Sequence, residues 1–89
     1  MISTRISISN KLGLHARASA KLTKLAGSYP CEIFISRGSR RVNAKSIMGV
    51  MMLAAGMGTE IELETAGERE QEAMDALLAL VGDKFGEGE

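Results

Sequence analysis

Residues 10–18 read NKLGLHARA and contain His15, the only histidine of the 89-residue chain. Before this stretch, residues 2–9 alternate apolar and polar side chains, which is the period of a half-buried strand. After it, residues 16–26 place alanine and leucine at helical spacing until Gly27 ends the pattern. The sequence therefore predicts a strand, a loop that carries His15, and a helix.

The rest of the chain also alternates between predicted strands and predicted helices. Alternation and turn residues predict strands at residues 31–37, 40–43 and 59–66, and apolar spacing predicts helices at residues 46–53 and 68–85, with a frayed tail at 86–89. The order is β-α-β-β-α-β-α. Half-polar strands with amphipathic helices favour an α+β fold, an open-faced β-sandwich whose antiparallel sheet carries its helices on one face.

Length and charge narrow the class of protein. A chain of 89 residues fits a single domain, residues 1–89, and leaves little room for a large enzyme pocket. The formal net charge is zero, which argues against a nucleic-acid partner, but residues 1–24 contain no acid while acids gather after Glu60. The half around His15 is therefore basic and favours an acidic partner surface.

The composition also bears on the compartment and on metal binding. Cys31 is the only cysteine, so we expect a reduced, buried thiol, no metal site and a cytoplasmic setting. No stretch has the pattern of a signal peptide or of a membrane span, so we expect no membrane insertion.

The position of His15 suggests phosphoryl chemistry. The first N–H groups of a helix lack intrahelical partners, and the macrodipole adds positive charge there, so phosphoryl oxygens can bind. The same field disfavours an imidazolium, and we expect His15 to be largely neutral and nucleophilic near pH 7. Arg17 adds a planar fork suited to phosphate. Taken alone, however, a lone histidine near a glycine at a helix start is more often a capping or surface residue than a phosphoryl acceptor.

Two segments together resemble a known family. Residues 10–20 (NKLGLHARASA) are similar to the active-site segment of HPr, the histidine-containing phosphocarrier of the bacterial phosphoenolpyruvate:sugar phosphotransferase system, and residues 43–53 (NAKSIMGVMML) resemble its regulatory serine segment. The resemblance implies four antiparallel strands with three helices packed on one side. It also implies that His15 accepts a phosphoryl group and that Arg17 stabilises its charge.

The same resemblance implies the partners. The donor would be phosphorylated enzyme I, charged by phosphoenolpyruvate, and the acceptor an enzyme IIA-type domain. The chain would be a monomeric transfer intermediate without a cofactor, rather than a stand-alone catalyst. One position departs from the family pattern, because Ala18 stands where most members have a proline that favours the first helical turn. We expect a slightly looser turn and no lost phosphate ligand.

Ser46 has two compatible interpretations. A serine before an apolar helical run is an N-cap. On the family resemblance it is also the regulatory phosphosite of relatives that have the bifunctional HPr kinase/phosphorylase. A phosphate there would add a charge of about −1.5 to −2 and change the surface without unfolding the helix.

The helix after Ser46 is apolar nearly all round, so part of it must be exposed. Its methionines either fill gaps in the core or form a surface that docks several partners. The resemblance favours docking for Ile47, Met48 and Met51. Two alternatives to a carrier remain: a binding-only paralogue, which the presence of His15 and Arg17 disfavours, and a small RNA-binding module, which scarce aromatic residues and zero net charge disfavour.

Overall fold

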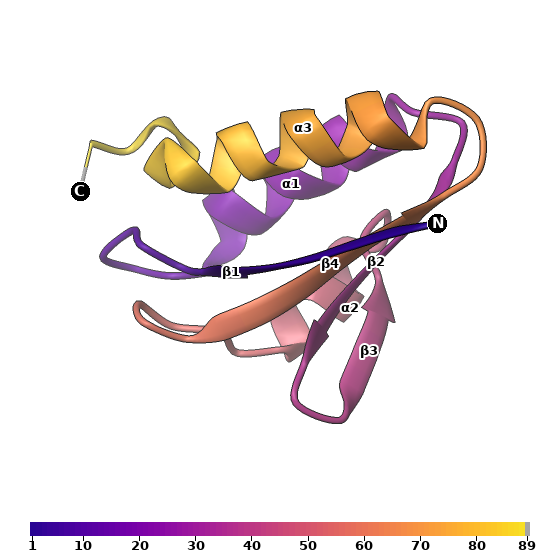
Figure 1. Ribbon diagram of the computed structural model, residues 1–89. Helices are drawn as coiled ribbons and strands as arrows, with labels where there is room; N and C mark the ends of the chain where they lie inside the picture. Colours follow the sequence, from indigo (N-terminus) through magenta and orange to yellow (C-terminus); the bar gives the residue numbers. More distant parts are fainter. Residues whose placement is uncertain (89) are drawn as a thin grey trace.

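The computed structural model describes residues 1–88 as a four-stranded antiparallel sheet with three helices (Figure 1). The elements follow the predicted order: β1 (Ile2–Ser7), α1 (Ala16–Gly27), β2 (Glu32–Arg37), β3 (Arg40–Asn43), α2 (Ile47–Met52), β4 (Glu60–Ala66) and α3 (Glu70–Gly82), then a 3₁₀ turn, η1 (Lys84–Gly86). The open-faced β-sandwich predicted from the sequence is confirmed.

The strand order in the sheet is β1-β4-β2-β3, and every neighbouring pair is antiparallel. In this register Ile6 lies opposite Ile61, and Ile35 lies opposite Leu63. Because side chains alternate between the two faces of a strand, the apolar residues of β2 and β4 turn toward the helices. The opposite face carries polar pairs, such as the 3.0 Å contact between Arg41 Nε and Glu64 Oε1.

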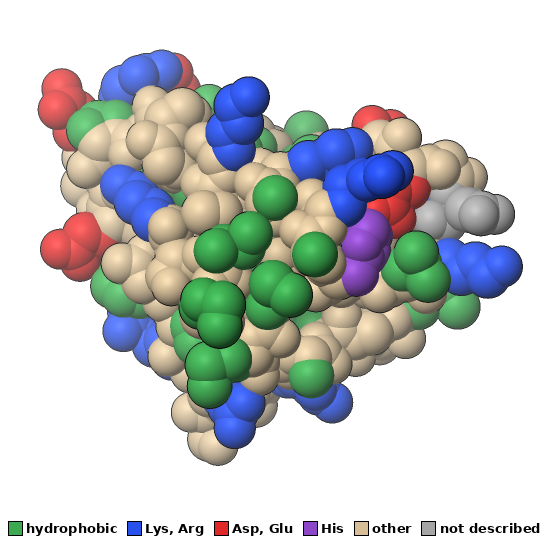
Figure 2. Space-filling view, turned by 180° about the vertical axis from the view of Figure 1, so that it is seen from behind, with side chains coloured by type: hydrophobic (Ala, Val, Ile, Leu, Met, Phe, Trp, Pro, Cys, Tyr) green, Lys and Arg blue, Asp and Glu red, His purple; other side chains and the backbone are tan. Residues whose placement is uncertain are grey.

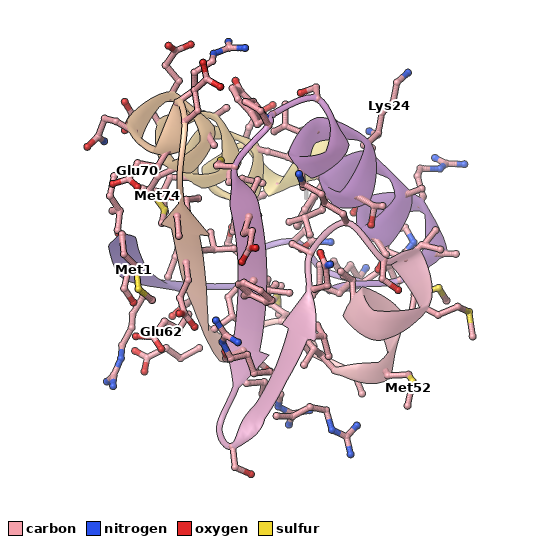
Figure 3. The ribbon with its side chains drawn as sticks, turned by 90° about the vertical axis from the view of Figure 1, so that its right-hand side faces the viewer. Met1, Lys24, Met52, Glu62, Glu70 and Met74 are labelled. Atoms are coloured by element: carbon pink, nitrogen blue, oxygen red, sulfur yellow. The ribbon has the colours of Figure 1, made fainter. Side chains whose placement is uncertain are left out.

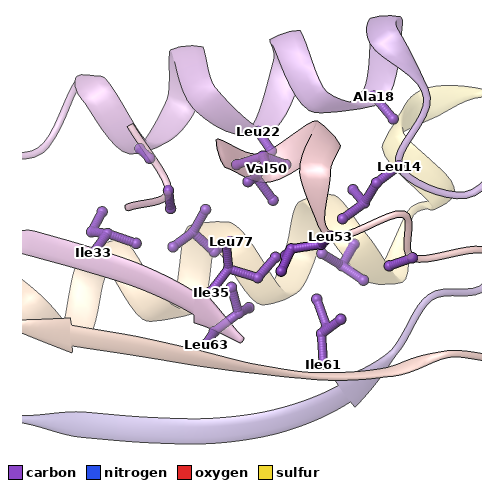
Figure 4. Close-up of a cluster of buried hydrophobic side chains, with 14 of the residues drawn as sticks. Leu14, Ala18, Leu22, Ile33, Ile35, Val50, Leu53, Ile61, Leu63 and Leu77 are labelled. Carbon is purple, nitrogen blue, oxygen red and sulfur yellow. The ribbon is translucent and has the colours of Figure 1, made fainter. Parts of the chain in front are cut away.

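The core lies between the sheet and the helices (Figure 4). Leu22 of α1, Val50 of α2 and Leu77 of α3 are fully buried against it. Burial of each such side chain contributes about 1.5–3 kcal/mol, so the three helices are held mainly by this apolar contact. Cys31 is also buried, as expected for a structural thiol.

The N-terminus of the chain lies against the first turn of α3. At its start, the ammonium of Met1 lies 3.1 Å from Oε2 of Glu70, and Figure 3 shows these two residues side by side. α3 begins at Glu70 rather than at the predicted residue 68. Arg69, which precedes the first helical turn, adopts a left-handed conformation with φ of 62°.

The end of the chain differs from the prediction. The predicted helix extends to Phe85, but α3 ends at Gly82, and Lys84 and Phe85 have φ of 54° and 56°. The apolar spacing correctly predicts that Phe85 is buried, since it is 1% exposed, but the predicted helical conformation of this residue is wrong. The predicted frayed tail is also wrong for residues 86 and 87, because Gly86 belongs to η1 and Glu87 makes side-chain hydrogen bonds. Glu89 lies outside the described residues.

Candidate functional site

His15 is the N-cap residue of α1. Its backbone is extended, with φ of −74° and ψ of 178°, and its carbonyl oxygen accepts the N–H of Ser19 at 2.8 Å. Its imidazole makes no capping hydrogen bond and is 28% exposed. The ring is therefore held at the beginning of the helix but remains accessible.

The first turn of α1 presents donors and positive charge beside this ring. No hydrogen bond within residues 1–88 engages the backbone N–H groups of Ala16, Arg17 and Ala18. Arg17 is exposed, and its guanidinium makes no ion pair in the same described part of the chain. Arg17 and His15 line one surface depression, together with Lys11 and Lys21. Figure 2 shows basic side chains next to the histidine, as an anion site requires.

Gly13 fixes the loop that leads into His15. It has φ of +64°, and a Cβ at this position would lie 2.4 Å from the carbonyl oxygen of Ala55. The next N–H, that of Leu14, donates to the same oxygen at 2.8 Å. Only glycine allows both the left-handed backbone and this close approach. The loop before His15 is thereby tied to the segment that follows α2.

Glu87 reaches the site from the other end of the chain. Its Oε2 lies 2.5 Å from Nε2 of His15, and its Oε1 accepts a hydrogen bond from Nδ2 of Asn10 at 3.1 Å. The amide of Asn10 and the His15 ring lower the pKa of the Glu87 carboxyl from its ordinary value. An ionised carboxylate only accepts, so Nε2 carries the ring hydrogen that is shared with Glu87.

Sequence reasoning did not find Glu87 or Asn10 as site residues. Glu87 is 72 positions from His15 in the sequence and lies in a Gly-Glu-Gly-Glu tail whose composition resembles a flexible end. No local periodicity marks it. Asn10 has a weak local signal, because a buried asparagine before a glycine turn commonly bonds to the backbone, and here its Nδ2 also donates to the Gly13 carbonyl at 2.8 Å.

Ser46 is the N-cap of α2, as predicted. Its Oγ accepts the backbone N–H of Gly49 at 3.2 Å, and its side chain lies on the surface. No hydrogen bond within residues 1–88 joins Ser46 to His15. The two sites therefore occupy the starts of two neighbouring helices rather than one pocket.

Exposed apolar side chains gather over and around α2. The predicted docking residues Ile47, Met48 and Met51 are 39%, 66% and 39% exposed, so they do not merely fill the core. Three further exposed apolar residues were not predicted: Met52 at the end of α2, Met57 in the loop after α2, and Leu12 in the loop before His15. Figure 2 shows apolar side chains grouped beside the histidine. We call the six residues the apolar surface.

Among residues 1–88 no group of three or more His, Cys, Asp or Glu side chains is placed to hold a metal ion. None of the helices in this part of the chain combines the length and the apolar character needed to cross a membrane.

Fold and site together define a small open-faced sandwich that presents a histidine and an arginine at an open helix start. Residues 2–83 match the family model described as PTS HPr component phosphorylation site. The chain belongs to this HPr phosphocarrier family of the phosphotransferase system.

Known relatives support this assignment along the whole chain. The phosphocarrier protein HPr of Cupriavidus necator is 64% identical over 89 residues, which is 100% of both chains. The crystal structure of HPr from Thermoanaerobacter tengcongensis has a TM-score of 0.95 at 41% identity and covers 98% of each chain. A second structure from that organism, described as an HPr dimer, has a TM-score of 0.79 at 41% identity and covers 98% of this chain and 100% of that one.

Proposed function

We propose that this chain carries a phosphoryl group on His15, which it receives from phosphorylated enzyme I and passes to an enzyme IIA-type domain. Phosphoenolpyruvate charges enzyme I. The observation that carries the proposal is the accessible imidazole at the start of α1, beside free backbone N–H groups and Arg17. All these residues come from one chain, so we propose a monomeric carrier that needs no cofactor.

The proposed transfer uses the ring nitrogen that is not engaged by Glu87. In the neutral ring Nδ1 holds a lone pair, because Nε2 carries the hydrogen. This lone pair forms a bond to phosphorus, while the bond from phosphorus to the donor breaks and its electron pair leaves with the donor. The N–H groups of Ala16 and Arg17 and the Arg17 guanidinium would receive the phosphoryl oxygens. Transfer to the acceptor reverses these steps.

The apolar surface would dock the partners. Exposed methionines adapt to several binding surfaces in turn, which suits a carrier that meets a donor and an acceptor. The apolar surface includes Leu12, which is three residues before His15 and lines the same depression, so a partner on it would reach the imidazole. The basic residues Lys11, Arg17 and Lys21 at its border favour an acidic partner.

Ser46 would regulate this docking. It lies immediately before Ile47 and Met48 in the sequence, so a phosphate on its exposed hydroxyl would place a charge of about −1.5 to −2 next to the apolar surface. The added charge would oppose an acidic or apolar partner. The kinase would be of the HPr kinase/phosphorylase class.

The decisive experiment is incubation of the purified protein and His15→Ala with enzyme I and phosphoenolpyruvate. Intact mass is measured before and after mild acid. We expect one acid-labile phosphate on the wild-type chain and none on H15A. If an enzyme I of demonstrated activity phosphorylates neither protein, the carrier function is wrong and a binding-only role replaces it.

A further inference from the structure

The residues that follow α3 form a turn that brings Glu87 to the active site. Lys84 and Phe85 adopt left-handed conformations, and Phe85 is 1% exposed, so its side chain anchors the turn in the core. Lys21 of α1 donates from Nζ to the Phe85 carbonyl at 2.6 Å. The N–H of Glu87 closes the turn on the Lys84 carbonyl at 3.0 Å. This turn holds Glu87 in one place.

The Glu87 carboxylate is engaged on both oxygens. Oε1 receives the amide of Asn10, which is itself fully buried and bonded to the loop before His15, and Oε2 faces Nε2 of the ring. The Glu87 side chain is only 13% exposed. A charged side chain normally extends into water, so the contact of this carboxylate with Asn10 and the imidazole is a specific arrangement.

We infer that Glu87 is a positioning residue for phosphoryl transfer, which fixes the tautomer of His15 and neutralises the charge that the ring acquires. The inference rests on the proposed function. A carboxylate on one ring nitrogen keeps the hydrogen there and leaves the lone pair on the other. Glu87 therefore holds the nucleophilic lone pair on Nδ1, the nitrogen that is not covered.

Charge balance gives Glu87 a second effect during transfer. When Nδ1 bonds to phosphorus and Nε2 keeps its hydrogen, the ring becomes cationic. The negative charge of Glu87 lies directly against this cation and stabilises it as it forms. When the acceptor attacks phosphorus, the N–P electron pair returns to Nδ1 and the ring is neutral again. Arg17 acts on the phosphoryl oxygens, whereas Glu87 acts on the ring.

Two substitutions separate the tautomer effect from the charge effect. Glu87→Gln retains an oxygen that can accept from Nε2 but has no charge, and Glu87→Ala has neither. Glu68→Gln and Glu68→Ala serve as matched controls, because Glu68 is an exposed acid of the loop between β4 and α3. Circular dichroism checks that each variant is folded.

The tautomer is read by long-range ¹H–¹⁵N spectra of the imidazole at about pH 8, where an unperturbed histidine is neutral. We expect the hydrogen on Nε2 in the wild type, in E87Q and in both controls, and a mixture of tautomers in E87A. An unchanged spectrum in E87A overturns the positioning role. This measurement needs no phosphate, so it decides the point even if the carrier function is wrong.

The charge effect is read by single-turnover phosphoryl uptake from phosphorylated enzyme I. We expect uptake roughly tenfold slower in E87A and an intermediate loss in E87Q, the range typical of residues that orient a functional histidine. If E87A and E87Q take up phosphate as fast as the Glu68 controls, the role of Glu87 in transfer is wrong while the carrier function stands. If the wild type takes up none, the carrier function itself fails.

Discussion

The starts of α1 and α2 are built alike and used differently. Each is preceded by a residue with extended backbone, His15 with φ of −74° and Ser46 with φ of −106°. The Ser46 hydroxyl accepts the backbone N–H of Gly49, whereas the His15 ring makes no capping hydrogen bond and faces Glu87. One helix satisfies a backbone donor internally, and the other leaves its donors open. A helix start can bind an anion when its cap side chain is engaged elsewhere.

The open start has an energetic cost that other contacts offset. A capping side chain contributes about 1 kcal/mol, and α1 lacks this contribution. α1 has 12 residues and buries Ala18, Leu22 and Ala26, whereas α2 has six residues and buries only Val50 among its own. The longer helix is held by the core, so its first turn is available for function. The shorter helix depends more on its cap.

The largest expected effect comes from Gly13→Ala, which disturbs the loop before the open start. The added Cβ would lie 2.4 Å from the Ala55 oxygen, and alanine is strained at φ of +64°. We expect the free energy of unfolding to fall by about 2–4 kcal/mol, measured by urea denaturation. The control is Gly27→Ala, where a Cβ meets nothing within 4 Å. A loss below about 1 kcal/mol in G13A would show that this loop is not rigid.

The next largest effect is expected for Arg17→Ala, which should slow phosphoryl transfer without lowering the stability of the fold. Arg17→Ala removes an exposed guanidinium that holds no ion pair within residues 1–88, so stability should change by less than about 0.5 kcal/mol. Phosphoryl uptake from enzyme I should slow by roughly 10- to 100-fold, because a charge stabiliser of the transferred group is lost. Arg5→Ala, on the outer face of the sheet, is the control and should transfer normally. Equal rates in the two variants would exclude Arg17 from the site.

The apolar surface beside the capped start should affect binding rather than chemistry. Met48→Glu places a charge on a side chain that is 66% exposed, so the fold should be retained. We expect KM for transfer from enzyme I to rise by about tenfold with little change in kcat, since binding is weakened before the reaction begins. Ala79→Glu, at an exposed position of α3, is the control. A normal KM in M48E would remove Met48 from the docking surface.

Two changes at the capped start should have opposite effects. Ser46→Ala removes the bond to Gly49 and should lower the free energy of unfolding by about 1 kcal/mol, with normal phosphoryl uptake. Ser46→Asp keeps an acceptor for the cap, so stability should be near that of the wild type, but its charge should slow uptake several-fold. Thermal unfolding and the transfer assay on the two variants check both expectations. Slower uptake in S46A than in S46D would contradict a regulatory role based on charge.

The sequence predicts the capped start better than the open one. Ser46 and Gly49 are three residues apart, so their bond is a local pattern that sequence reasoning can find. Strand alternation likewise predicts the sheet, since the buried residues of β2 and β4 follow the expected parity. Glu87 could not be found this way, because two successive left-handed residues, Lys84 and Phe85, redirect the chain after α3. Local preference disfavours such a turn, and it is held by contacts distant in the sequence, namely the burial of Phe85 and the hydrogen bond from Lys21 to its carbonyl.

The smallest expected effect is the pH dependence of the stability that Glu87 contributes at the start of α1. The Glu87 carboxyl has a pKa below its ordinary value, because the Asn10 amide and the His15 ring bind its charged form. A lowered native pKa contributes stability that is complete above the ordinary glutamate value of about 4.3 and is lost as the pH falls through the native value. The difference in unfolding free energy between the wild type and Glu87→Gln should therefore shrink as the pH falls below about 4, where the Glu87 carboxylate becomes protonated. Urea denaturation across this range, with ¹³C titration of the Glu87 carboxyl, measures it. A difference that does not shrink below about pH 4 would mean that the neutral carboxyl, not the carboxylate, is the form bound by Asn10 and His15.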